Sequence, residues 1–339
     1  AGLEEWLFGA GGRSVDVAPV DCGGSGRMRI EITWDSPTGI LVAEPQKDGL
    51  GEGADAGAAD GSLEGADSEE TKPARPLRAG PEETDPIVLP GSSVRGALRT
   101  RATRIARTIL LAKKDPSTGA DWSNAGVHEQ VAQDPSLVRD LFGSTTHRGA
   151  LTVLDTLAAE DGPSRKVTHN AGDRWTGGVA DGLLYSEEVY DSTWNSIVLE
   201  LDLDRLLTNA KAGLGEPGGQ EDSRGENRSR AAFCLLGLVL AELAAGTLPL
   251  GSRGTRGMGQ VEVKAMAVTG GKGLGIENWS LKAEDGAGES LPRRILKGLR
   301  DVSSGIERNP RAGAGWEGWS SYLVSSSERP LEDKEERDA

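Results

Sequence analysis

The sequence has few of the residues on which several classes of protein depend. Only 4% of its 339 residues are aromatic, and it contains two cysteines, Cys22 and Cys234. Neither cysteine lies in a CxxC motif or near a histidine at metal-ligand spacing, which excludes a disulfide framework and argues against a zinc site. No apolar run approaches the roughly 20 residues that span a bilayer. The first residues also lack the basic and apolar regions of a secretory signal. We therefore expect a cytoplasmic protein that does not contact membranes.

Basic residues are outnumbered by acidic ones, 38 to 53, and the formal net charge is −15. Taken alone, this charge argues against binding to a nucleic acid. The acidic residues are concentrated, however. Residues 48–70 hold eight carboxylates and no lysine or arginine, which predicts a disordered acidic insertion. We interpret residues 328–339 as a mobile acidic tail.

One segment has the opposite charge. Residues 92–114 carry seven basic side chains and no acidic one. A charge run of this kind is often only the solvated face of a helix, but here no carboxylate stands one turn away to pair with the cations. The sequence therefore favours a solvated helix face and a polyanion-binding surface about equally.

Hydrophobic periodicity predicts six regular elements. The expected strands are 28–34, 151–154, 197–203 and 260–268, and the expected helices are 94–109 and 230–245. Their order predicts an α+β fold with a ferredoxin-like, RRM-like βαββαβ core and long insertions. The excursion at 156–195 is much longer than an ordinary connection and is expected to be functional.

The turn before the first helix reads Pro90-Gly91-Ser92-Ser93. Ser92 or Ser93 is expected to N-cap that helix, and a helix N-terminus suits an anion such as phosphate. Arg95 and Arg99 lie one turn apart and could extend the site along a sugar–phosphate backbone.

Two more segments combine residue types that suit RNA. Residues 250–259 contain four glycines with Arg253 and Arg256, which allows close backbone approach to a ligand; a flexible turn is the alternative. Residues 166–178 suit base stacking and phosphate contact. Their candidate contact residues are Lys166, His169, Asn170, Arg174 and Trp175. We place Trp175 against a base and Trp34, Trp122 and Trp194 in the core.

These segments, in this order, resemble the RAMP superfamily of CRISPR effector proteins, and most closely the repeated guide-RNA-binding backbone subunit of type III complexes. The matching motifs are Pro90-Gly91-Ser92-Ser93 with Arg95 and Arg99, Leu141-Phe142-Gly143-Ser144 with a strand ending in Asp155, Asp173-Arg174-Trp175-Thr176, and the glycine-rich loop 251–259. The resemblance implies a subunit that holds guide RNA through Ser92, Ser93 and the four arginines. Its thumb would insert between bases of the guide–target duplex.

The resemblance also implies partners and a domain plan. The partners would be guide RNA, complementary target RNA and other RAMP-type subunits or copies of the chain itself, with no cofactor. The RAMP domain would span 27–268, with its thumb at 156–195, followed by an extension over 269–327. Residues 1–26 are interpreted as the end of a preceding RAMP-like copy, since Leu7-Phe8-Gly9 echoes the Leu-Phe-Gly at 141–143; a chance match is the alternative.

The alternative function is a target-RNA or guide-precursor endonuclease of the same fold, which would use Mg²⁺. The resemblance implies a catalytic aspartate about fifteen residues before the Pro-Gly-Ser-Ser turn, acting with metal on a ribose 2′-hydroxyl. That position holds Ala74, Arg75 and Pro76. The remaining candidates are Asp67, Glu70 and Asp85. Asp67 and Glu70 are equally well explained as part of the acidic insertion, so the sequence leaves enzymatic activity open.

Overall fold

The computed structural model describes most of the expected domain. The described residues are 26–44, 74–112, 128, 134–172, 174–212, 221–270, 278–285 and 288–304. The N-terminal segment up to residue 25, the acidic insertion 48–70 and the tail 328–339 lie outside this part of the chain, as do Asp67, Glu70 and Trp122.

The centre of the fold is a five-stranded sheet. Its strands are β1 (Arg27–Asp35), β3 (Leu151–Val153), β8 (Ile197–Asp202), β9 (Glu262–Gly270) and β10 (Trp279–Lys282). They lie in the order β10-β9-β1-β8-β3, and every neighbouring pair is antiparallel. Ile30 pairs with Leu199 on one side and with Val268 on the other, which fixes β1 in the middle of the sheet.

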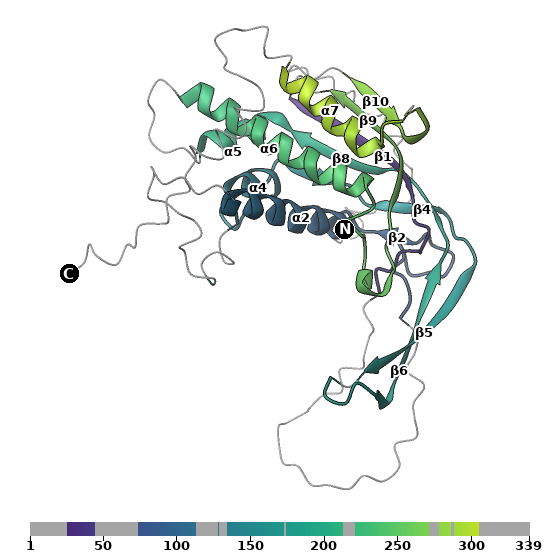
Figure 1. Cartoon of the computed structure of the whole chain (residues 1–339). Coiled ribbons are helices and arrows are strands. Elements are labelled where there is room, and N and C mark those ends of the chain that lie inside the picture. The colour runs from purple at the N-terminus through teal and green to yellow at the C-terminus, as the bar shows by residue number, and fades with distance from the viewer. Residues whose placement is uncertain are drawn as a thin grey trace, which may run out of the picture.

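Helices cover one face of this sheet (Figure 1). They are α2 (Gly91–Ala112), α4 (Ser136–Phe142), α5 (Leu203–Ala212), α6 (Glu221–Ala244) and α7 (Leu291–Ser304). Strand β1 alternates between exposed and buried residues, and Met28, Ile30, Ile32 and Trp34 are buried against α2 and α6 in the core. The opposite face of the sheet is open along β1, where Arg29 and Thr33 are exposed.

The chain order confirms the expected α+β class and the six predicted elements. Strands β1 and β3 are joined through α2 with β8 between them, and β8 and β9 are joined through α6 with β1 between them. The sheet therefore contains two interleaved split βαβ units, the arrangement on which the ferredoxin-like expectation rests.

Two features close the helical layer. In the C-terminal extension, β10 adds an edge strand and α7 buries Leu291 and Ile295, so this part of the extension caps the sheet. Between α4 and α6, Arg228 makes a bidentate ion pair with Asp140, and both side chains are at most 5% exposed. The expected core position of Trp34 is confirmed, since it is buried and stacks on the half-buried Trp194 at 5.6 Å.

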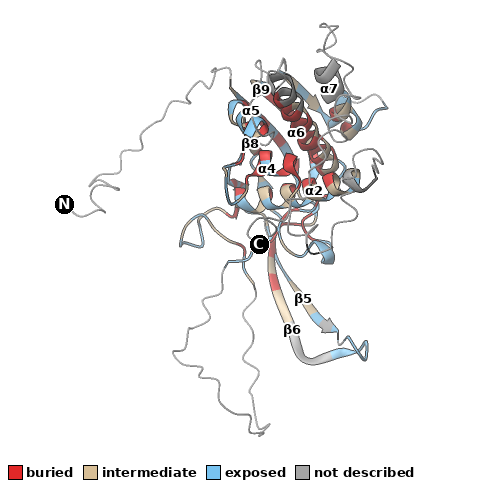
Figure 2. Ribbon diagram, turned by 90° about the vertical axis from the view of Figure 1, so that its left-hand side faces the viewer, coloured by how far each residue is buried: buried red, intermediate tan, exposed pale blue. Residues whose placement is uncertain are grey.

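The excursion at 156–195 is built from strands. A small sheet joins β2 (Val88–Leu89), β4 (Thr156–Glu160) and β7 (Thr193–Trp194), and a hairpin joins β5 (Ser164–Gly172) to β6 (Val179–Tyr190). The hairpin projects away from the body of the domain in both views (Figures 1 and 2). Trp175 lies in the turn at its tip and is 93% exposed.

Candidate RNA-binding surface

The start of α2 differs from the sequence expectation in one respect. The helix begins at Gly91, so Ser92 and Ser93 lie in its first turn and neither is the N-cap. The Gly91 N–H donates to the Asp155 carboxylate at 2.7 Å, while the N–H groups of Ser93 and Val94 donate to the Pro90 carbonyl. A carboxylate from the chain itself thus occupies part of the anion position that we assigned to phosphate.

Arg95 and Arg99 both have protein partners in this structure. Arg95 donates to the carbonyl oxygens of Leu151, at 3.3 Å, and Phe142, and its guanidinium lies 6.0 Å from the centre of the Phe142 ring. Partial burial, and to a smaller extent the charge of Arg99, lowers the pKa of Arg95. Arg99 forms an ion pair with Asp134. Contact of either arginine with RNA stays a prediction, and it requires an exchange of partners.

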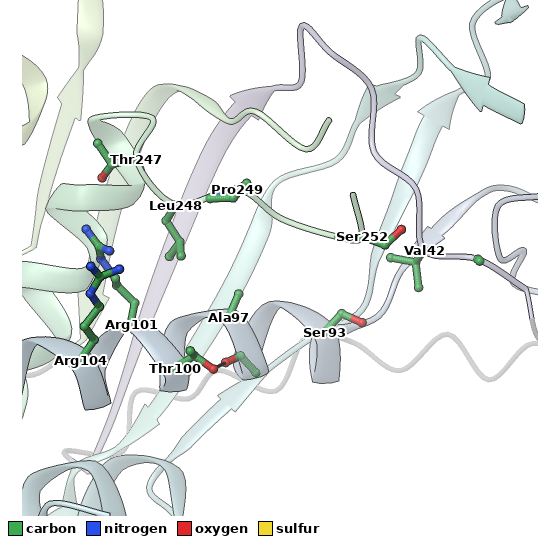
Figure 3. Close-up of a pocket in the computed structure, with 13 residues that line it drawn as sticks. Val42, Ser93, Ala97, Thr100, Arg101, Arg104, Thr247, Leu248, Pro249 and Ser252 are labelled. Atoms are coloured by element: carbon green, nitrogen blue, oxygen red, sulfur yellow. Dashed lines mark hydrogen bonds between the residues drawn. The ribbon is translucent and has the colours of Figure 1, made fainter. Parts of the chain in front are cut away.

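A groove of about 660 Å³ separates α2 from residues 247–252 (Figure 3). Arg101, Arg104 and Thr247 lie toward one end, and Ser93 and Ser252 toward the other. Arg104 is exposed, whereas Arg101 pairs with Glu242. The rest of the lining is small or apolar, and it consists of Val42, Ala43, Gly96, Ala97, Thr100, Leu248, Pro249 and Gly251. The groove combines cations, hydroxyl groups and apolar surface.

Gly96 gives the groove close access to the helix backbone. It lies inside α2, where a glycine destabilises a helix by roughly 0.5–1 kcal/mol relative to alanine. A Cβ atom at this position would meet nothing within 4 Å. The protein itself therefore leaves room there for a side chain, and the missing side chain enlarges the groove.

The glycine-rich loop is a defined turn. Its ends are joined by a hydrogen bond from the Leu250 N–H to the Gly259 carbonyl, and Ser252 donates both its N–H and its hydroxyl to the Leu41 carbonyl. Gly259 has φ +77°, and a Cβ there would lie 2.1 Å from the Leu250 oxygen. Arg253 adopts a left-handed conformation, φ 64°, without being glycine. The flexible-turn alternative therefore does not describe this loop.

The loop brings two of the predicted segments together. Its first residues line the groove beside α2, while Arg253 and Arg256 reach Glu187 at the base of the hairpin. His169, in the other hairpin strand, has Nε2 3.2 Å from the same carboxyl group. The groove, the loop and the hairpin base are thus contiguous.

The remaining predicted residues lie elsewhere on the hairpin. Lys166 and Asn170 are exposed and alternate with His169 along β5, which puts them on the opposite face of the hairpin. Arg174 and Trp175 are exposed at its tip. The predicted thumb residues are therefore distributed over both faces and the tip.

The described carboxylate candidate for catalysis has a structural contact. Asp85 accepts the Glu82 N–H at 2.8 Å and so closes the turn formed by 82–85. Within the described ranges, no three histidine, cysteine or acidic side chains gather as metal ligands. Mg²⁺-dependent cleavage stays a hypothesis, and the contacts of Asp85 do not add to it.

Sequence reasoning missed several residues of this surface. Glu187 has no local signal because its partners Arg253 and Arg256 lie more than sixty residues away in the chain. Arg104 belonged to the recognised basic run, but only the fold shows that it lines the groove. Asp155 was recognised as the end of a motif strand, without its contact to α2.

Comparison with known proteins identifies the family. A family model described as the RAMP superfamily matches residues 7–262, which is most of the chain. No curated protein matches the sequence. No helix in the described part of the chain is long and apolar enough to cross a membrane. RAMP proteins are CRISPR-associated, generally bind RNA and work in multi-subunit complexes. The chain therefore belongs to the RAMP superfamily of CRISPR-associated proteins.

Proposed function

We propose that this chain is a guide-RNA-binding backbone subunit of a type III CRISPR effector complex, and that hairpin β5–β6 is a thumb inserted between bases of the guide–target duplex. One observation carries the proposal. The glycine-rich loop contacts the groove beside α2 on one side and the base of the hairpin on the other. A single RNA strand in the groove would pass directly to the hairpin.

The chemistry of the groove suits a strand held by its backbone. Arg104 offers an exposed cation for phosphate, and Ser93 and Ser252 offer hydroxyl groups at the other end. The floor of small and apolar residues accepts ribose and base surface, and Gly96 permits close approach to α2. None of these contacts reads a base edge, so binding would depend little on sequence, as RNA held along its phosphates requires.

The hairpin suits insertion between bases. Its tip presents the indole of Trp175 and the guanidinium of Arg174 far from the core. Aromatic rings and guanidinium planes both stack on unpaired bases. An exposed tryptophan at the end of a projecting hairpin adds nothing to the core, and stacking on a base gives it a role.

The test is a binding titration on salt-washed protein. The absorbance ratio at 260 and 280 nm of the purified protein is expected to show bound nucleic acid, which is then removed in high salt. A labelled guide RNA should bind the stripped protein with an affinity that falls linearly on a log–log plot against salt. Addition of complementary RNA should retain the complex. Absence of binding at low salt would refute the proposal.

A further inference from the structure

Glu187 is a buried carboxylate surrounded by cationic side chains. It lies on β6, and its side chain is 0% exposed. Arg253 donates its Nε–H to Oε1, and an Nη atom of Arg256 lies 3.7 Å from the same oxygen. His169 Nε2 lies 3.2 Å from Oε2, although the two groups are not aligned as a hydrogen bond. One carboxylate thus faces three side chains that can carry positive charge.

Tyr185 completes the cluster. It lies two residues before Glu187 on the same face of β6, where its ring stacks on His169 at 5.3 Å. The guanidinium groups of Arg256 and Arg253 lie 4.8 and 5.8 Å from the centre of that ring. Two elements that are distant in sequence, the hairpin and the glycine-rich loop, are therefore joined by ionic and cation–π contacts.

The loop side of this junction is under conformational cost. Arg253 is the non-glycine residue with positive φ in the described part of the chain, a conformation that costs a side-chain-bearing residue of order 1–3 kcal/mol. Its side chain is held by Glu187, and Ser252 next to it is held by the Leu41 carbonyl. The ion pair with Glu187 offsets part of this cost, so the loop and the hairpin hold each other in place.

We propose that Glu187 is a positioning residue: it is a buried counter-ion that holds the hairpin on the glycine-rich loop and competes with RNA phosphate for Arg253 and Arg256. The competition rests on the proposed RNA-binding function of the loop. A phosphate that takes a guanidinium group from Glu187 weakens the contact that holds the hairpin. By thermodynamic reciprocity, the position of the hairpin then alters the affinity of the loop for RNA.

The competition has a sign that a merely structural role would not produce. Glu187→Gln removes the competing charge and frees both guanidinium groups for phosphate. The affinity for RNA should therefore rise about three- to tenfold at low salt, and the slope of log affinity against log salt should become more negative by about 0.7, the value of one phosphate contact to a single strand. Arg253→Gln breaks the same junction from the other side but removes a phosphate-binding cation, so affinity and slope should both fall.

The chain offers a matched control for charge. Glu188 is the next residue on β6, points to the opposite face of the hairpin, and contacts Arg75 and Tyr190 rather than the loop. Glu188→Gln changes the net charge by the same amount as Glu187→Gln. A difference between the two variants therefore reports the junction and not the total charge.

The experiment measures two quantities on each variant. Hydrogen–deuterium exchange of the β5 and β6 amides in RNA-free protein reports how firmly the hairpin is held. Fluorescence anisotropy with a labelled uridine homopolymer, at several salt concentrations, reports RNA binding. Glu187→Gln and Arg253→Gln should both accelerate exchange at the hairpin base about tenfold or more relative to Glu188→Gln, while they shift RNA affinity in opposite directions.

The outcomes separate this inference from the proposed function. If the wild-type chain binds the homopolymer but Glu187→Gln and Glu188→Gln match in both measurements, the inference fails and the proposed function stands. If the wild-type chain does not bind RNA, the proposed function and the competition fail, and exchange in the RNA-free variants still decides whether Glu187 holds the hairpin. Should Glu187→Gln not fold, Arg253→Gln tests the same junction, and unchanged exchange in that variant overturns it.

Discussion

Gly96→Gln separates a role in ligand binding from a role in folding. Gly96 lies inside α2, and a side chain built there meets open space in the groove. Glutamine is nearly as good a helix former as alanine, so the substitution should stabilise the protein by about 0.5–1 kcal/mol. For a domain of this size, that gain corresponds to a rise in melting temperature of about 1–4 °C.

The same substitution should weaken RNA binding. The glutamine side chain would occupy the part of the groove where the backbone of α2 is most accessible. Loss of even one charge-assisted contact, worth about 1.5–3 kcal/mol, lowers affinity at least about tenfold. Anisotropy with a labelled guide RNA measures the affinity, and thermal unfolding of RNA-free protein measures the stability. Thr108→Gln, at an exposed α2 position that does not line the groove, is the control.

Two results would refute this reasoning. A more stable Gly96→Gln protein with unchanged RNA affinity would show that no RNA approaches α2 at the groove. A less stable protein would show that the glycine is required by the fold, contrary to the open space around it.

Three further predictions follow from the described contacts. Trp175→Ala should weaken guide binding by about 1–3 kcal/mol with an unchanged melting temperature, because the indole is 93% exposed; a lower melting temperature would place this residue in the fold. Asp140→Asn leaves Arg228 buried without its counter-ion and should cost about 3–5 kcal/mol in chemical denaturation, whereas Asp134→Asn, which breaks the more exposed pair with Arg99, should cost at most about 1 kcal/mol. Burial raises the pKa of Cys234 from 9.0 to about 11, so the folded state favours the neutral thiol; that contribution to stability is complete below pH 9 and is lost as the pH rises toward 11. At pH 8 a thiol reagent should label Cys234 only as fast as the protein unfolds, and rapid labelling of native protein would contradict its burial.

The core elements were predictable because their side chains alternate strongly. Strand β1 has an apolar residue at every second position, and the buried part of α6 is apolar on nearly all sides, so both were recognised from sequence. The first turns of α6 are polar, and the helix therefore begins at residue 221, well before the predicted residue 230. The hairpin strands gave no such signal because exposed residues dominate β5.

The site was less predictable than the fold, because its geometry depends on residues distant in sequence. The basic run on α2 suggested free cations, yet Arg95 and Arg99 turn toward the Phe142 carbonyl and Asp134. Composition shows that an arginine is present, and only the tertiary structure shows what it contacts. The tip of the hairpin is the opposite case: Trp175 stood among glycines and charges, and its exposure agrees with that local context.

Mapping of RNA crosslinks tests the central claim most directly. A photoreactive 4-thiouridine RNA would be bound to the stripped protein, irradiated and digested, and the modified peptides would be identified by mass spectrometry. The account predicts crosslinks in α2, in residues 247–259 and at the hairpin tip around Trp175. Crosslinks confined to the open face of the sheet, around Arg29 and Thr33, would contradict it, because that is where an RRM-like domain binds RNA through its sheet.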